Sequence, residues 1–390
     1  MQQPTPRKTY LDNASTSFPK PPQVVEAVVN FMTEGGTNAG RGEYAAALDT
    51  DDMVFSTREK LCSLLGGQDP SCVAFTRNVT EALNLVLKGT LHTNDHVIVS
   101  GMEHNAVMRP LVQLASHGIE FSRAPCEPDG TLDPREVERL IRPNTKLIAM
   151  THASNVCGTV LPIEQVGRIA QEHGLLFVVD AAQTAGVIPV RLDDLCADAV
   201  CFTGHKGLLG PQGIGGAVMS RSLAKTIEPL VAGGTGSASD SEEIPAFLPD
   251  RLEAGTLNLP GIAGLEAALD WLEQKGIDAV RTHEQALAAA FIDGLAPLQT
   301  RGLVRTLGLP TGEGRTGVVS IQTLGRDLAE AAHELDARFG IQTRVGLHCA
   351  PAAHKTLGTF PVGTIRFSFG WANTKDDVER ALDALESILS

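Results

Sequence analysis

Short apolar runs alternate with amphipathic stretches along the first two thirds of the chain. The runs are strand-like because each is short and rich in Val, Ile, Leu and Phe, whereas the stretches between them repeat apolar residues at helical spacing. This alternation predicts a mainly parallel sheet that is covered by helices. The predicted strands are 73–76, 95–100, 146–154, 175–181 and 199–204, and the predicted intervening helices are 78–89, 105–118, 134–142 and 163–174.

The rhythm of the chain changes after Pro260. Helical stretches at 263–276 and 280–295 are followed by a strand-like run at 316–323, a helix at 327–340, a strand-like run at 364–370 and a helix at 375–389. This order predicts a smaller α+β domain. We therefore expect a large domain over residues 12–259 and a small domain made of residues 1–11 and 260–390.

Composition and charge narrow the class of protein. The chain has 390 residues, of which 43% are apolar and 20% charged, as in soluble globular proteins. Its net charge of −14 argues against binding to nucleic acids and to anionic membranes. The N-terminus lacks the apolar core of a secretion signal and no segment resembles a membrane span, so a cytoplasmic location is expected. Seven cysteines without CxxC spacing suit free thiols in a reducing compartment.

An acid and a lysine give the first indication of chemistry. Asp180 ends the apolar run that begins at Leu175, and open α/β sheets bind ligands at the carboxyl ends of such strands. Lys206 follows in the glycine-rich segment TGHKGLLGPQGIGG. Pyridoxal phosphate (PLP) requires an amine that holds it as a Schiff base and an acid that keeps its pyridine nitrogen protonated. Taken alone, Lys206 also fits a solvated lysine in a loop, and Asp180 also fits a buried structural acid that accepts hydrogen bonds. Only the two residues together predict the cofactor.

A candidate phosphate site follows the first predicted strand. In FTRNVTEALNLVL, Asn78 followed by Glu81 resembles a capping box, and the free amides at this helix start form an anion site with the Thr80 hydroxyl. An ordinary helix cap is the alternative. The segment GPQGIGG precedes a strand instead of linking a strand to a helix, so it does not fit a dinucleotide-binding fingerprint.

The segment RVGLHCAPAAH contains a candidate nucleophile. Cys349, flanked by His348, suits a reactive thiolate, although a buried structural cysteine fits the same pattern. A structural zinc needs four ligands and no second Cys/His pair has finger spacing beside His348 and His354, so no metal is expected. Arg366 lies in the apolar run TIRFSFG, where its charge needs a carboxylate; a substrate carboxylate and an internal acid are both open.

These residues belong to a longer series of motifs that resembles a known family. The motifs are YLDNASTSFPKPP, FTRNVTEALNLVL, MEHNAVMRPL, THASNVCGTVLPI, VVDAAQTAGV, FTGHKGLLGPQG, EAGTLNLPGIAGL and GLHCA. In order and spacing they resemble the NifS-like cysteine desulfurases of the class V aminotransferase group, which are fold-type I PLP enzymes. The resemblance runs from about Tyr10 to the last helix. It implies an α/β fold with a mainly parallel seven-stranded sheet in the large domain and a smaller α+β C-terminal domain.

The resemblance also implies how the cofactor is held. Lys206 would bind PLP covalently, Asp180 would pair with the pyridine nitrogen, and His104 would stack on the ring and relay protons. Gln183 would face the ring hydroxyl. The residues implied for the phosphate are Val79, Thr80, Thr203 and His205.

The implied reaction converts L-cysteine to L-alanine. Asn155 and Arg366 would bind the substrate carboxylate, and the Cys349 thiolate would take the substrate sulfur as a persulfide for an acceptor protein. Thr256, in EAGT, would contact the cofactor phosphate of the neighbouring subunit, which implies a homodimer. The sequence departs from the family at Leu347, where members with this short cysteine segment commonly have a histidine, so the activation of Cys349 is left open.

Other functions remain compatible with the sequence. A selenocysteine lyase or another PLP-dependent C–S lyase would act on L-selenocysteine without requiring Cys349. A class V aminotransferase would form pyruvate with an amino acceptor. A third alternative is a binding protein with the same fold and no catalytic activity. The presence of Lys206, Asp180 and His104 together argues against it. The sulfur acceptor, the pathway and the preference between sulfur and selenium are not determined by the sequence.

Overall fold

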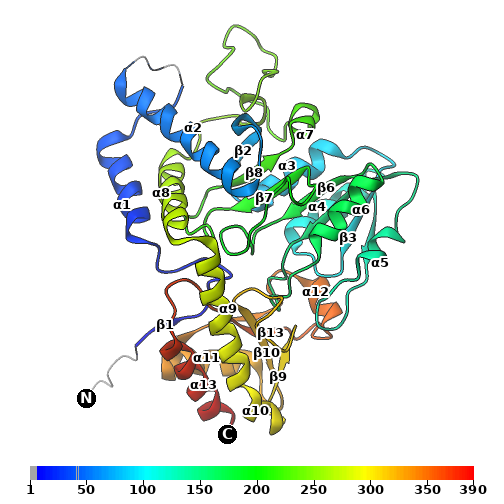
Figure 1. The fold of residues 1–390 in the computed structure, drawn as a ribbon, viewed down its shortest axis with the longest axis vertical. Helices are drawn as coiled ribbons and strands as arrows, with labels where there is room; N and C mark the ends of the chain where they lie inside the picture. The colour runs from blue at the N-terminus through cyan, green and yellow to red at the C-terminus, as the bar shows by residue number, and fades with distance from the viewer. Residues whose placement is uncertain (1–6, 41, 43) are drawn as a thin grey trace.

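The computed structural model describes residues 7–40, 42 and 44–390 of the chain. Within this range the chain forms a larger sheet of seven strands, a smaller sheet of four strands and a separate two-stranded sheet, and the larger sheet lies above the smaller one in Figure 1. Residues 1–6, which the predicted small domain includes, lie outside the described range. Across the described range, no helix combines the length and the apolar character needed to cross a membrane.

The larger sheet has seven strands, as the family resemblance implies. In spatial order they are β2 (Val73–Thr76), β8 (Gly215–Met219), β7 (Ala199–Thr203), β6 (Leu176–Asp180), β5 (Thr145–Thr151), β3 (His96–Ser100) and β4 (Glu120–Ala124). β8 runs antiparallel to both of its neighbours, and the remaining pairs are parallel. The sheet is therefore mixed but mainly parallel, and the predicted α/β fold class is confirmed.

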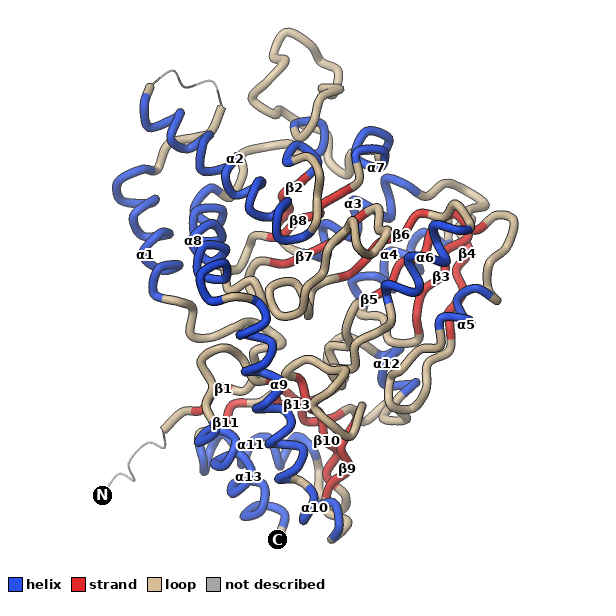
Figure 2. The backbone as a smooth tube through the Cα atoms, viewed as in Figure 1, coloured by secondary structure: helices blue, strands red, loops and turns tan. Residues whose placement is uncertain are grey.

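Helices cover both faces of this sheet because its strands are apolar on both sides (Figure 2). In β6, Phe177 and Val179 point into one core and Val178 points into the other. The first core is closed by α1 (Pro22–Asn30), α2 (Ala45–Leu65), α5 (Pro134–Glu138), α6 (Ile163–Glu172) and α8 (Leu259–Lys275). The second core is closed by α3 (Val79–Thr90), α4 (Asn105–Ala115) and α7 (Arg221–Thr226).

The smaller sheet is antiparallel and has its own core. Its strands in spatial order are β12 (Arg344–Gly346), β13 (Thr364–Ser368), β10 (Val318–Thr323) and β9 (Val304–Leu307). Phe291, Leu335 and Leu385 pack against this sheet from α9 (Ile277–Gly294), α11 (Leu328–Phe339) and α13 (Lys375–Leu389). The N-terminal strand β1 (Thr9–Tyr10) pairs in parallel with β11 (Ile341–Gln342), which fixes the start of the chain here.

Short helices complete the chain, and the junction between α8 and α9 bears on the predicted domain boundary. The short helices are α10 (Ala296–Thr300), α12 (Pro351–Thr356), a π-helix at Phe31–Gly35 and 3₁₀ turns at Pro70–Cys72 and Asp250–Leu252. By its core contacts, α8 packs with the large sheet and α9 with the small one. The division of the chain between residues 259 and 260 stays a prediction.

Candidate active site

The carboxyl ends of the parallel strands open into a cavity of about 310 Å³. This edge is where open α/β sheets bind ligands. Segments that are far apart in the sequence meet in the cavity wall, which includes the ends of β5, β6 and β7 and the starts of α3 and α4. All predicted site residues except Thr256, Cys349 and Arg366 line it; the lining residues are Asn78, Val79, Thr80, His104, Thr151, Asn155, Asp180, Ala182, Gln183, Thr203, His205 and Lys206.

Asp180 and Lys206 give the cavity its acid and its amine. Asp180 ends β6, is 3% exposed, and accepts a hydrogen bond from the Ala182 amide at 3.0 Å. Burial raises the pKa of Asp180, while the Ala182 amide and the charge of Lys206 oppose this shift. Burial lowers the pKa of Lys206 from 10.5 to about 8, against the attraction of Asp180. The cavity therefore suits a ligand with a cationic ring nitrogen and a carbonyl that reacts with amines.

The loop that carries Lys206 is fixed by close backbone packing. A Cβ atom on Gly207 would meet the Ala185 carbonyl at 2.6 Å, so only glycine fits directly after the lysine. On the facing loop after β6, the Gln183 side-chain amide donates to the Ala14 carbonyl at 3.1 Å. These contacts join the lysine loop, the loop after Asp180 and the N-terminal segment into one wall.

The start of α3 forms an anion site in the cavity. Asn78 caps the helix, and its side chain accepts a hydrogen bond from an amide of the first turn. The amides of Val79 and Thr80 have no acceptor within the helix because they lie in its first turn. Thr203 Oγ1 and His205 Nδ1 are buried and lack a hydrogen-bond partner among the described residues. Unpaired donors of this kind indicate a ligand that accepts several hydrogen bonds.

His104 is the N-cap of α4 and also lines the cavity. Its Nδ1 accepts a hydrogen bond from the Ala106 amide at 3.0 Å, so the ring proton belongs on Nε2. Burial lowers the pKa of His104 to about 4, and the charges of Lys206, Arg366 and Arg109 act in the same direction. The imidazole is therefore neutral at pH 7 and has a fixed tautomer, which suits stacking on a planar ring and proton exchange at Nε2.

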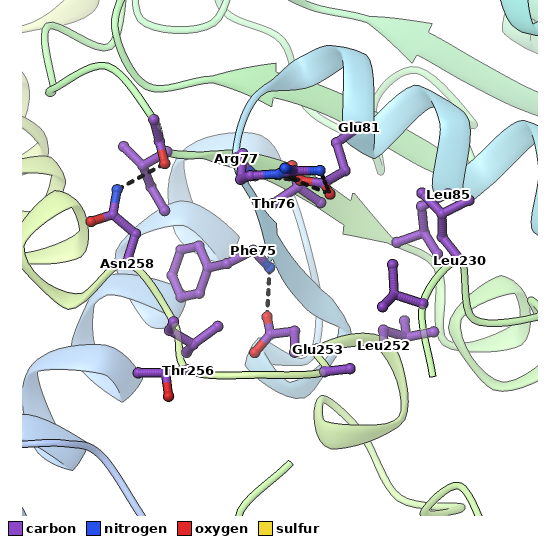
Figure 3. Close-up of a pocket in the computed structure, with 15 residues that line it drawn as sticks. Phe75, Thr76, Arg77, Glu81, Leu85, Leu230, Leu252, Glu253, Thr256 and Asn258 are labelled. Carbon is purple, nitrogen blue, oxygen red and sulfur yellow. Dashed lines mark hydrogen bonds and ion pairs between the residues drawn. The ribbon is translucent and has the colours of Figure 1, made fainter. Parts of the chain in front are cut away.

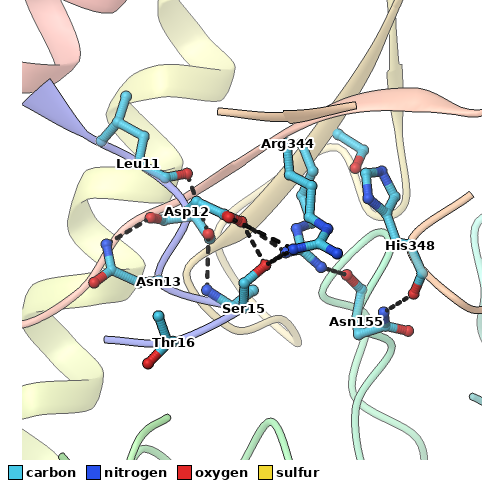
Figure 4. Close-up of polar contacts among 12 residues, drawn as sticks. Leu11, Asp12, Asn13, Ser15, Thr16, Asn155, Arg344 and His348 are labelled. Carbon is cyan, nitrogen blue, oxygen red and sulfur yellow. Dashed lines mark hydrogen bonds and ion pairs between the residues drawn. The ribbon is translucent and has the colours of Figure 1, made fainter. Parts of the chain in front are cut away.

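Arg366 is buried and forms a polar network with the N-terminal segment. Figure 4 shows its partners Asp12, Ser15 and Asn155 close together. Its Nη2 donates to Asp12 Oδ1 at 2.9 Å and to Ser15 Oγ at 2.7 Å, and its Nη1 donates to the Asn155 carbonyl at 2.9 Å. The internal acid that the sequence left open as a partner is thus Asp12. The Nε atom of Arg366 is buried and has no partner among the described residues, so one donor of this guanidinium stays unpaired.

Cys349 is exposed and lies on the loop between β12 and α12. His348 and Cys349 have φ angles of 47° and 56°, which are strained for residues other than glycine. The Asn105 amide donates to the Cys349 carbonyl at 2.9 Å. This hydrogen bond joins the cysteine loop to the residue that follows His104, and so to the wall of the cavity.

His348 holds this loop and does not place a positive charge beside the thiol. Its Nε2 is 2.9 Å from Thr364 Oγ1, and its carbonyl accepts from the Asn155 side chain at 2.8 Å. Burial lowers the pKa of His348 to about 2, so the ring is neutral at pH 7. Leu347 closes the turn through its carbonyl, which accepts from the Ala350 amide at 2.8 Å.

Thr256 lies outside the cavity, in a neighbouring pocket (Figure 3). The segment that carries it is fixed by Glu253, which pairs with buried Arg58 at 2.6 Å and accepts from the Phe75 amide at 2.5 Å. A further open hollow is lined by both Thr256 and His205. Within one chain Thr256 is therefore near the anion site but does not line the cavity that contains it.

Most of the chain matches a family model. The model described as Aminotransferase class-V matches residues 9–381. The chain belongs to the class V aminotransferase family. The chain is 34% identical to a probable cysteine desulfurase from Methanothermobacter thermautotrophicus, over 97% of this chain and 94% of that protein.

Solved structures of cysteine desulfurases are also similar to this chain. An apo cysteine desulfurase from Thermococcus onnurineus NA1 superposes with a TM-score of 0.91 and 31% identity, over 98% of this chain and 94% of that one. A cysteine desulfurase from Escherichia coli gives a TM-score of 0.86 and 30% identity, over 98% and 95% of the two chains. The predicted family resemblance is therefore confirmed.

Two features of the site were not predicted from the sequence. Asp12 and Ser15 come from the motif YLDNAST, which indicated the family without assigning a role to either residue. Glu103 is fully buried, accepts a hydrogen bond from the Thr151 amide at 3.1 Å, and has its pKa raised to about 8 by burial. Glu103 thus joins the turn before α4, which carries His104, to the end of β5, and no pattern in the sequence indicated this contact.

Proposed function

We propose that this protein is a PLP-dependent cysteine desulfurase, which converts L-cysteine to L-alanine and keeps the sulfur as a persulfide on Cys349. One observation carries the proposal: an exposed cysteine loop is hydrogen-bonded to the wall of the cavity that contains Lys206 and Asp180. The amine and the acid suit the cofactor, and the thiol suits a sulfur acceptor. The names of the similar proteins support the same activity.

The residues of the cavity fit PLP. The amides at the start of α3 and the unpaired Thr203 Oγ1 and His205 Nδ1 match the phosphate. Asp180 matches the protonated pyridine nitrogen because a buried carboxylate needs a cationic partner. His104 would stack on the ring and Lys206 would attach the cofactor covalently. When bound, PLP would supply an electron sink that weakens the bonds at Cα of an amino acid.

Side chains of this protein fit each later step of the proposed reaction. Asn155 and the free Nε of Arg366 bind the substrate carboxylate and orient the amino acid. Once the amino group of the substrate has replaced it on the cofactor, the freed Lys206 amine would take the α-proton, since a pKa of about 8 leaves part of it neutral at pH 7. The Cys349 thiolate then bonds to the substrate sulfur, the C–S bond breaks with its electron pair on carbon, and protonation of that carbon gives alanine.

Product analysis with the purified protein and PLP tests this function. We expect a visible absorption band from bound PLP, and one alanine for each sulfur that dithiothreitol removes after L-cysteine is added. A protein that stays colourless would instead be a binding protein on this fold. Formation of pyruvate with an amino acceptor would assign the aminotransferase activity and contradict the proposal.

Capture of PLP by the apoprotein should depend on pH through Lys206. The neutral amine is the nucleophile, so the capture rate should rise about tenfold per pH unit below the pKa of about 8 and level off above it. Stopped-flow absorbance of the apoprotein mixed with PLP measures this profile. A rate that keeps rising towards pH 10.5 would show that burial does not lower the pKa of this amine.

We further propose that the protein is a homodimer whose subunits complete each other's sites. Apolar side chains are exposed on α1, its π-helical extension and α2, with Val29 51%, Met32 68% and Phe55 54% exposed. Phe55 and Thr256 line the same surface hollow. A second copy packed on this apolar surface would cover it and bring Thr256 to the phosphate of its neighbour.

Replacement of Thr256 by alanine should weaken PLP binding about ten- to a hundredfold, since one hydrogen bond to a charged phosphate is lost. A mixture of Thr256→Ala and Lys206→Ala subunits separates contact across the dimer from contact within one chain. If Thr256 acts across the dimer, the mixed dimer contains one complete site, and activity returns when the two inactive or weakened proteins are refolded together. Activity no higher than that of the separate variants would contradict this arrangement.

A further inference from the structure

The loop after β5 folds back on itself as a short hairpin, in which Ala153 and Val160 pair as an antiparallel bridge. The tip of this hairpin is the turn formed by residues 155–158. The turn begins with Asn155, which lines the cavity. The position of the turn therefore sets the position of a side chain that we propose for the substrate carboxylate.

Each carbonyl of this turn accepts a hydrogen bond from the small sheet or from the segment that leads into it. The donors, in the order of the turn, are Arg366 Nη1 to Asn155 at 2.9 Å, Ser320 Oγ to Val156 at 2.6 Å, Arg315 Nη2 to Cys157 at 2.6 Å and the Thr316 amide to Gly158 at 2.9 Å. Arg366 lies in β13 and Ser320 in β10. Arg315 and Thr316 lie between β9 and β10. The four bonds hold the turn as one unit on the small sheet.

The turn lies too close to β10 for a side chain at its last position. Gly158 has a φ of 79°, and a Cβ atom on this residue would meet the Val318 carbonyl at 2.6 Å. Glycine adopts this backbone conformation without strain. The contact between the turn and β10 is therefore fixed by close packing as well as by hydrogen bonds.

Arg315 is a fully buried cation in this contact. Besides the Cys157 carbonyl, its guanidinium donates to the carbonyls of Leu309 and Val318 at 2.5 and 2.7 Å. Burial lowers the pKa of Arg315 from 12.5 to about 10, so the side chain is charged at pH 7. It has no acidic partner among the described residues, and a buried cation without one is costly. The guanidinium is instead matched to three backbone carbonyls.

The same turn contacts the cysteine loop. The Asn155 side chain donates to the His348 carbonyl at 2.8 Å (Figure 4), and Cys349 follows directly in the chain. The turn is thus bonded to Arg366 on one side and to the cysteine loop on the other. A shift of the turn would change the spacing of all three groups.

We propose that Arg315 is a positioning residue for the substrate carboxylate. By holding the Cys157 carbonyl, it fixes the turn two residues after Asn155, and so keeps the Asn155 side chain at the spacing from Arg366 that a carboxylate needs. Arg315 does not line the cavity, so it acts through the turn. This inference rests on the proposed function, which assigns Asn155 and Arg366 to the carboxylate.

Two ligands of the PLP-loaded protein test this role. L-Alanine has the carboxylate, and ethylamine is the same amine without it. Arg315→Lys keeps the charge but loses the planar group that meets three carbonyls. We expect this variant to bind L-alanine roughly tenfold more weakly and ethylamine less than about twofold more weakly, as measured by the visible spectrum of PLP. The KM for L-cysteine should rise roughly tenfold at an unchanged kcat.

Two further variants serve as a second test and as a control. Ser320→Ala removes the neighbouring donor to the turn and should show the same selectivity with a smaller loss. It decides the question if Arg315→Lys does not fold, since an unchanged affinity for L-alanine in Ser320→Ala would then contradict the role of the turn. Arg380→Lys is the control, because Arg380 also donates to backbone carbonyls, those of Arg7 and Phe339. It should keep the affinity for both ligands.

The outcomes separate this proposal from the function on which it rests. Equal losses of affinity for the two ligands, or no loss for either, would overturn the positioning role and leave the desulfurase intact. A selective loss for L-alanine in a protein that releases no alanine from L-cysteine would keep the positioning role and overturn the desulfurase. No spectral response of the wild-type protein to either ligand would overturn both.

Discussion

Replacement of Lys206 by alanine should reduce the release of alanine from L-cysteine by at least about a thousandfold. The reason is that one amine would serve two steps, the attachment of the cofactor and the removal of the α-proton. Lys206 is also the only lysine that lines the cavity in the described structure. Alanine measured by chromatography gives the rate, and the visible spectrum shows whether PLP is still held.

Chemical rescue separates this role from a structural one. A small primary amine such as methylamine should restore part of the activity of Lys206→Ala. It replaces the missing amine but cannot repair a structural defect. Lys225→Ala, on the surface helix α7, should retain full activity. If Lys206→Ala kept a tenth or more of the activity, Lys20 would be the next amine to test, since it contacts the His205 carbonyl at 2.8 Å.

Replacement of Asp180 by asparagine should reduce turnover by roughly a hundred- to a thousandfold. The asparagine keeps the size of the side chain but removes the negative charge that would hold the pyridine nitrogen protonated. Because the phosphate donors remain, PLP should still bind. The measurement is the turnover number at saturating PLP, with the bound cofactor counted by absorbance after release in alkali.

Asp198 provides a matched control for this substitution. It precedes β7, at the opposite end of the same sheet, and burial raises its pKa as it does that of Asp180. Its carboxylate accepts from the Phe177 amide at 3.1 Å and the Ser220 hydroxyl at 3.0 Å. Asp198→Asn should therefore lower the free energy of unfolding and leave turnover unchanged. If both variants lost turnover equally, Asp180 would have only a structural role, like Asp198.

The sequence was sufficient to place a residue where the local pattern of apolar and polar residues determines its position in the fold. A buried parallel strand is an apolar run, and the residue that ends it lies at the ligand edge of the sheet, so the apolar run alone predicts the position of Asp180. β4 was missed because it is an edge strand with the sequence EFSRA, which is half exposed and has no apolar run. The helix predicted at 134–142 is shorter in the structure, at Pro134–Glu138.

Long-range pairing could not be predicted in the same way. Asp12 and Arg366 are 354 residues apart in the sequence, and only the folded chain shows which acid meets the buried arginine. The position of Thr256 outside the cavity likewise depends on the Arg58–Glu253 pair, which joins α2 to the segment before α8. The neutral state of His348 follows from its burial, which adjacency to Cys349 in the sequence does not indicate.

Alanine release by the PLP-loaded protein and by its Cys349→Ala variant, each with L-cysteine and with L-selenocysteine, tests the central claim most directly. We expect the variant to lose the reaction with L-cysteine and to keep that with L-selenocysteine, because only the cysteine C–S bond needs attack by a thiolate. Retention of both reactions, or wild-type activity on L-selenocysteine alone, would contradict the desulfurase and assign a lyase.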